Sequence, residues 1–419
     1  MGVGLYLLGR LGTPIDDALT TVERFFRHRY AEDLLSAATS DDGGPLLRMT
    51  THPAAETVDV RVDGKRITFS AKTSTVGPGY HADLCDTLRA LGTALDIEWD
   101  PPDEEEGTGD ETGYFATGDR DALESEMLRW LQQTARILLE HRDEAGKALA
   151  LSMPISPRYH GPPGATLLTQ MGPRDAEWLR RVHADPHVGT DIFPWWSPGR
   201  GAAYELGRVL VHLWLDARFH PAATEDEERL GRELLRRLAR AYRSDPTLDY
   251  PWAAWAMLHD DVVDADDDDL SETIRDRAAQ VGENTIGYRE WDVDASLADG
   301  WHITVPGSFS TQVDDDGTWS AWEDGHTVWA TAFSRARNGA PAPAEEMFSE
   351  KPSEGTPTVI EGLEAPYRAH ISSFEEDDDE YWRVTAQIAR PGRLLLVTAV
   401  VPDKPLLGWA HRVIASVRG

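Results

Sequence analysis

An acidic run near the middle of the chain divides it into two parts. Seven aspartates stand among the ten residues from Asp260 to Asp269. Consecutive like charges cannot be buried together, so this segment must lie in solvent and act as a linker. It lacks the spaced oxygen ligands, central glycine and closing glutamate of a calcium loop, and we expect no metal here.

The length of the chain supports this division. Its 419 residues exceed one ordinary core, and one domain per roughly 100 to 200 residues predicts two or three. The pattern of helix and strand signals predicts an α+β chain. We expect an α+β domain over 1–153, a mainly helical segment packed on it over 154–259, an acidic linker with a short helix over 260–284, and a second α+β domain over 285–419.

The charge restricts the partners that this chain can bind. A formal net charge of −32 argues against nucleic acid and anionic membranes, since both repel an acidic surface. A basic protein is the natural complement, although acidity can also serve solubility alone. No apolar run approaches the length of a membrane span, and the first residues lack the features of a signal peptide. We therefore expect a cytoplasmic protein.

Helix and strand signals alternate in the first 153 residues. The stretch from Thr13-Pro14 to about Ala38 has helical spacing of apolar residues, and Asp63-Gly64 predicts a hairpin. These signals predict a mixed antiparallel sheet with helices. The further expected elements are strands over 46–52, 57–62, 66–71, 96–99 and 147–153, a strand end at Tyr114-Phe115, and helices after Gly79 and over 120–141.

The turn from Lys72 to His81 is the main candidate for a ligand site. A strand stops there in Gly77-Pro78-Gly79 and a helix begins. Backbone N–H groups at a helix start favour an anion, and Lys72 adds a positive charge. Lys72, Gly77, Gly79 and His81 are therefore the candidate ligand-binding residues. The alternative is that the glycines only turn the chain sharply.

His81 also stands four residues before Cys85, the single cysteine. This spacing places both on one helix face, where a thiolate and imidazole pair can form. Leucines continue the same stripe, however, and a free cysteine on an apolar stripe usually serves packing. The chain carries no HExxH or GxSxG motif. We expect no catalytic residue, no cofactor and no metal.

Three aromatic residues, Phe193, Trp195 and Trp196, stand in a loop flanked by prolines. Proline prevents a regular element there, so these rings cannot pack at helical spacing. They either cap the helical core or anchor a protein contact, and they are the candidate protein-contact residues.

Two segments resemble known folds. The order Gly300-Trp301-His302-Ile303-Thr304-Val305-Pro306-Gly307, an antiparallel series, a final apolar strand and a closing helix over 406–417 resembles the MOG1/PsbP-like fold. That resemblance implies an α+β domain that mediates protein contacts. The residues around 230–255 resemble the junction of two tetratricopeptide repeats, which implies a local helical hairpin without a repeat series.

Two functions are compatible with these observations. The first is a non-enzymatic, protein-binding component of a cytoplasmic bacterial system, such as an adaptor, an immunity-like inhibitor or an accessory subunit. The alternative is an enzyme or small-ligand sensor with an anion-binding site at Lys72 to His81. An open pocket at that turn would favour the alternative, and a filled core would favour the binder.

Overall fold

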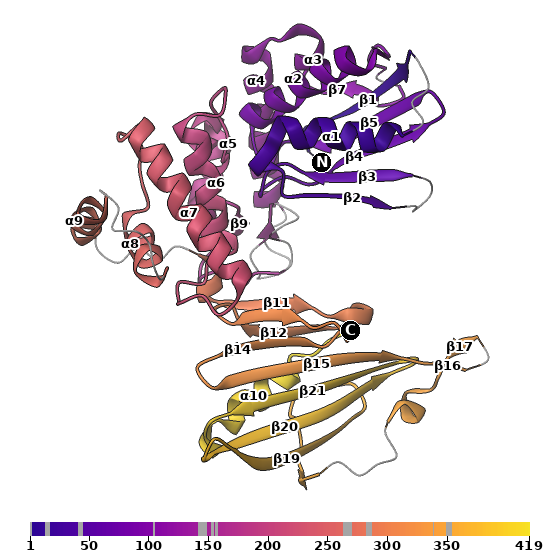
Figure 1. The fold of residues 1–419 in the computed structure, drawn as a ribbon, viewed down its shortest axis with the longest axis vertical. Coiled ribbons are helices and arrows are strands. Elements are labelled where there is room, and N and C mark those ends of the chain that lie inside the picture. The colour runs from indigo at the N-terminus through magenta and orange to yellow at the C-terminus, as the bar shows by residue number, and fades with distance from the viewer. Residues whose placement is uncertain are drawn as a thin grey trace. The chain divides into compact units, whose positions relative to one another are not determined.

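A computed structural model describes residues 2–12, 17–40, 45–103, 105–140, 149–151, 155, 158–262, 270–281, 287–337, 339–348 and 354–419. These residues form two compact units. Unit 1 comprises Met1–Ser156 and Gly161–Gly287, and unit 2 comprises Pro157–His160 and Tyr288–Gly419. Both combine helices with antiparallel sheets, so the predicted α+β class is confirmed (Figure 1). Residues 263–269 of the acidic run lie outside the described residues.

The first part of unit 1 is a seven-stranded antiparallel sheet. Its order is β2-β3-β4-β5-β1-β6, and β7 also pairs with β1. The predicted hairpin at Asp63-Gly64 joins β4 to β5 and is confirmed. The strands are β1 (Gly4–Leu11), β2 (Ser36–Ser40), β3 (Leu46–Thr50), β4 (Val58–Asp63), β5 (Arg66–Lys72), β6 (Ile97–Trp99) and β7 (Gly109–Asp110).

Two helices, α1 (Ala18–Tyr30) and α2 (Pro78–Leu95), pack against this sheet (Figure 1). Each buries one stripe of apolar side chains at a spacing of three or four residues, which is the pattern of an amphipathic helix. In α1 the stripe holds Val22 and Phe26, and in α2 it holds Leu84, Leu88 and Leu91.

Three sequence predictions for this region are wrong. The first helix ends at Tyr30 rather than Ala38, because Ala31 takes a positive φ of 46° and residues 36–40 pair with β3 as an edge strand. Gly4–Leu11 is a central strand that was not predicted. The segment Tyr114–Thr117 is a helical turn, α3, and not a strand end. In the first two places, pairing with strands that are distant in sequence overrides the local signal. At α3, the neighbouring glycines Gly113 and Gly118 bound a single helical turn.

The rest of unit 1 is mainly helical. It also contains a small three-stranded sheet with the order β10-β9-β8. Its elements are α4 (Arg120–Glu140), β8 (Leu149–Ala150), β9 (Leu167–Thr169), β10 (Gly172–Arg174), α5 (Ala176–Ala184), the 3₁₀ helix η3 (Pro186–Ile192), α6 (Ala202–Leu215), α7 (Glu225–Ser244), α8 (Trp252–Asp261) and α9 (Ser271–Val281). No helix in the described ranges has the length and apolar character that crossing a bilayer requires.

A buried ion network joins the helical part to the sheet part. Arg237 on α7 contacts Asp33 at 2.9 Å and Glu205 on α6 at 2.7 Å. Asp33 lies in the turn after α1, and the Nε atom of Arg208 on α6 lies 3.8 Å from the Oδ1 atom of Asp33. Arg208 and Arg237 are buried, so removing one partner would leave an uncompensated charge inside the unit.

Unit 2 is built around a second seven-stranded antiparallel sheet, with the order β13-β14-β15-β21-β20-β19-β18. The helix α10 (Leu407–Ala415) packs on one face against β20 and β21 (Figure 1). Ile303 and Val305 on β12, and Trp301 directly before it, enter the same core. The strands are β11 (Asp292–Ser296), β12 (His302–Pro306), β13 (Ser310–Val313), β14 (Trp319–Glu323), β15 (His326–Ser334), β16 (Ala336–Arg337), β17 (Ala340–Pro341), β18 (Thr356–Pro357), β19 (Tyr367–Glu376), β20 (Asp379–Arg390) and β21 (Arg393–Val401).

The sequence predicts most of unit 2 correctly. The sequence signals predict five strands, over 317–323, 327–334, 367–374, 381–390 and 393–401. These strands and the closing helix appear within a few residues of their predicted bounds. The sequence also predicts a strand over Thr285 to Arg289, and this prediction is wrong, because Tyr288–Glu290 forms a 3₁₀ turn and the strand β11 begins at Asp292. Residues 285 and 286 lie outside the described residues.

Gly207 offers a test of the packing inside unit 1. It lies within α6, where a Cβ would stand 1.8 Å from the carbonyl oxygen of Pro194. We expect Gly207→Ala to destabilise unit 1 by about 1 to 3 kcal/mol, because the backbone must shift. The control is Gly408→Ala in α10, where the nearest atom is the Arg412 side chain at 3.7 Å. Urea unfolding measures both variants, and equal stability of the two would contradict this packing.

Candidate functional site

The backbone amides of the turn from Lys72 to His81, which the sequence predicts as an anion site, are bonded to carbonyl groups of the same chain. The Gly79 amide donates to the Trp195 carbonyl at 3.0 Å, and the Trp195 amide donates to the Val76 carbonyl at 3.0 Å. The Gly77 amide donates to the Thr73 carbonyl at 3.1 Å. Protein acceptors therefore already use the amides that an anion would need at Gly77 and Gly79.

The two glycines of the turn allow this close approach. A Cβ on Gly79 would lie 2.2 Å from the indole of Trp195, and one on Gly77 would lie 2.8 Å from the Trp195 carbonyl oxygen. Gly77 also has a φ of 114°, which side chains rarely tolerate. The glycines thus turn the chain and seat the aromatic loop.

The aromatic loop packs into the interior. Phe193 and Trp195 are buried, and Trp196 is half-buried against Phe193 with ring centroids 5.5 Å apart. Trp195 packs on Tyr204 at 4.3 Å between centroids and donates its indole N–H to the Gly199 carbonyl. In this structure the rings of Phe193 and Trp195 therefore cap the core, and a partner could not reach them without displacing the loop.

The structure separates Lys72 from His81. The Lys72 ammonium pairs with Glu56 at 3.0 Å, and both side chains are about one third exposed. His81 is fully buried. The neighbour of Lys72, Thr73, is the residue that reaches the imidazole. The four predicted ligand-binding residues therefore do not line one pocket.

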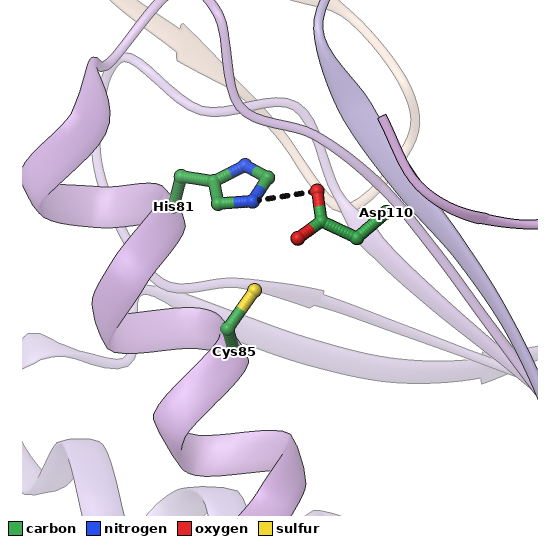
Figure 2. Close-up of side chains that lie close together, drawn as sticks. All are labelled: His81, Cys85 and Asp110. Atoms are coloured by element: carbon green, nitrogen blue, oxygen red, sulfur yellow. Dashed lines mark ion pairs between the residues drawn. The ribbon is translucent and has the colours of Figure 1, made fainter. Parts of the chain in front are cut away.

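His81 instead belongs to a buried cluster with Asp110 and Cys85 (Figure 2). Its Nε2 lies 2.9 Å from Asp110 Oδ1, and its Nδ1 lies 2.8 Å from the Thr73 hydroxyl. Because an ionised carboxylate only accepts, the imidazole proton lies on Nε2 and points to Asp110. The Thr112 hydroxyl adds a contact to Nε2 at 3.1 Å.

Asp110 is held by the turn that follows β7. Its carboxylate accepts from the amides of Thr112 at 2.9 Å and Phe115 at 2.6 Å. Burial alone would raise the pKa of Asp110, but the His81 contact and these amides outweigh it and lower the pKa below its ordinary value of 3.8. Asp110 therefore stays ionised and ties α2 to the start of α3.

Two kinds of chemistry can be considered for this cluster. The order hydroxyl, imidazole, carboxylate at Thr73, His81 and Asp110 is that of a nucleophilic relay. All three side chains are buried, however, so the Thr73 hydroxyl is closed to a substrate from solvent. Ligand atoms of His81, Asp110 and Cys85 lie within 4.8 Å of one another and could hold a soft metal ion.

A metal ion would have to displace the proton on His81 Nε2 and ionise the thiol. Burial, and then the charge of Asp110, raise the pKa of Cys85 well above its ordinary value. The hydrogen bonds already present satisfy His81 and Asp110 without a metal. The geometry is therefore that of a structural clamp, and Cys85 packs beside it as the leucine stripe predicted.

Sequence reasoning found His81 and Cys85 but missed Asp110, Thr73 and Thr112. A signal for Asp110 was present in the sequence. Asp110 is followed by Thr112 and Gly113, and this pattern is typical of a turn that an aspartate side chain caps. Its partner lies 29 positions earlier, and the sequence offers no means of pairing the two.

Comparison with known proteins leaves the identity open. No family model matches the chain, and no curated protein matches it. A crystal structure from Bacteroides thetaiotaomicron VPI-5482 is similar over 28% of this chain, with 12% sequence identity and a TM-score of 0.24. The match covers 44% of that chain, and a similarity at this level shows neither fold nor function.

The lowered pKa of Asp110 predicts an acid-sensitive contribution to stability. The stabilisation is present above the unfolded pKa, near 3.8, and is lost as the pH falls through the lower folded value. Asp110→Asn should cost roughly 1 to 3 kcal/mol at pH 7 and make the loss of stability in acid shallower. Urea unfolding between pH 2 and 7 measures this, with the exposed Asp86→Asn as control. Equal pH profiles of the two variants would contradict the clamp.

Cys85 gives a second test, since it is the single thiol of the chain. Because it is buried and its pKa is raised, Ellman's reagent should not react with the folded protein on the timescale on which it labels the urea-unfolded chain. Fast labelling in native buffer would show an exposed or ionised thiol instead.

Proposed function

We propose that this chain is a non-enzymatic, protein-binding component of a cytoplasmic bacterial system, and that its partner presents a basic surface. An adaptor, an immunity-like inhibitor and an accessory subunit all fit this role. The observation that carries the proposal is the hairpin tip between β19 and β20. Its six residues, Glu375 to Glu380, are all acidic and all exposed.

The tip reduces the stability of its own hairpin. Register places Glu375 opposite Glu380 and Glu376 opposite Asp379, and like charges directly opposite are destabilising. The loop residues Asp377-Asp378 have φ values of 53° and 69°, for which asparagine and glycine are preferred. Opposite charges and an Asn-Gly loop would make a more stable hairpin. A cationic surface would relieve the repulsion, so the tip supports a basic partner.

Aromatic residues accompany the tip on the sheet face opposite α10. Phe374 and Tyr381 stack with centroids 5.7 Å apart, and the Arg383 guanidinium lies over Phe374 at 5.5 Å. Strand register puts Trp329 on the same face, two strands away from β20 and level with Thr385, where it is 40% exposed. Aromatic and arginine side chains are enriched at protein interfaces. The face therefore offers contact area beside the charge.

The packing at Gly77 to His81 supports this choice over the alternative of an enzyme or small-ligand sensor at that turn. The alternative needs an open pocket lined by Lys72. The turn is instead filled by Phe193 and Trp195, and Lys72 pairs with Glu56. A filled core is the arrangement expected for a protein that acts by binding.

Neutralising the tip should separate binding from stability. The variant with Asp377, Asp378 and Asp379 all changed to Asn removes three charges from the tip. We expect it to be as stable as the wild type or up to about 1 kcal/mol more stable at low salt, and to lose its partner. Thermal unfolding measures the first expectation.

Affinity purification from the native host, with quantitative mass spectrometry, measures the second. The matched control changes Asp314, Asp315 and Asp316 to Asn, which removes the same three charges from the β13–β14 turn. The control should recover the same proteins as the wild type, and the tip variant should recover them in at least tenfold lower yield. Equal recovery by the tip variant would refute the proposal.

A further inference from the structure

A pocket opens in unit 1 where α6 ends between α7 and α8. The space between its walls, counted together with the open solvent at its mouth, is about 440 Å³. The floor is apolar, and Leu230, Leu234, Leu258 and Val262 contribute to it. Such a floor would accept a ring or a branched aliphatic group.

Glycine and backbone strain shape this pocket. Gly231 stands inside α7, where a Cβ would come within 2.9 Å of Val262, and glycine within a helix costs about 1 kcal/mol relative to alanine. Phe219 in the pocket wall has a φ of 57°, which is unusual for a bulky residue. Strain of this kind occurs preferentially at ligand sites.

The charges at the pocket favour a cation. Arg218 pairs with Glu227 at 3.0 Å, and both are largely buried, so these two charges compensate each other. The ends of α6 and α8 both reach the pocket, through Asp216 and Asp261. A helix C-terminus carries partial negative charge and attracts cations.

Asp261 is the carboxylate best placed to receive that cation. It is the last residue of α8 and lines the pocket, and no hydrogen bond or ion pair joins it to another residue in the part of the chain that the structure describes. Burial raises the pKa of Asp261; His220 opposes the rise and Asp260 adds to it. An arriving cation would stabilise the ionised carboxylate.

The geometry points to a binding site for a small amine with an apolar ring or branched body, whose ammonium contacts Asp261 while its body lies on the leucine floor. The site belongs to unit 1 and does not depend on the proposed function of the tip in unit 2. A carboxylate ligand would instead meet Asp216, Asp261 and the two helix C-termini.

Three probes of one shape test the inference on the full chain: 2-phenylethylamine, 2-phenylethanol and phenylacetate. Titration calorimetry should give the tightest binding for the amine, weaker binding for the alcohol and the weakest for the acid. Methyl resonances of Leu230, Leu234 and Leu258 should shift with the amine in the wild-type protein, which places the ligand without a variant. Binding of phenylacetate as tight as that of the amine, or no binding of any probe at millimolar concentration, would overturn the inference.

A matched pair of variants tests the role of Asp261. Asp261→Asn should weaken the affinity for the amine by roughly ten- to hundredfold, because one charge-assisted contact is lost. The affinity for the alcohol should stay within about twofold of its wild-type value. Asp260→Asn removes the neighbouring charge, which is not part of the pocket lining, and should change amine binding by less than about threefold. Equal loss in both variants would assign the effect to general charge and refute the contact.

Discussion

The insertion of Trp195 beside the Gly77-Pro78-Gly79 turn is the contact on which unit 1 depends. It joins the strand and helix of the first sheet to the loop that precedes α6, through two backbone hydrogen bonds. Glycine at 77, 79 and 207 is required because a Cβ at each would overlap this loop. The indole then packs on Tyr204, so the helical part is placed on the sheet part by backbone contact as well as by side-chain burial.

Buried polar groups make this arrangement specific. The Asp33, Arg237 and Glu205 network lies between α1, α6 and α7, and the clamp of His81 and Asp110 lies between α2 and α3. Such groups are costly to leave unpaired in an interior. An alternative packing of the same helices would break these pairs and leave uncompensated charges inside the unit, which favours the observed arrangement.

Several elements could be predicted from local signals alone. The hairpin at Asp63-Gly64, the helix from Pro78 and the five long strands of unit 2 follow from turn residues and from alternation of apolar side chains. The errors occur where local signals are weak. Ser36–Ser40 becomes a strand only because β3 offers a partner, and Gly4–Leu11 is central only because β5 and β6 flank it. The resemblance of unit 2 to the MOG1/PsbP-like fold stays a prediction.

By itself, the sequence determined the acidity, the single thiol, the α+β class and the candidates His81 and Trp195, because these depend on composition and short-range spacing. Only the tertiary structure decided their roles. His81 meets Asp110, and Gly79 meets Trp195 from 116 positions away. Contacts between distant segments decide which polar groups are buried. A buried, hydrogen-bonded group such as His81 acts as a structural clamp, whereas an exposed one could form a ligand site.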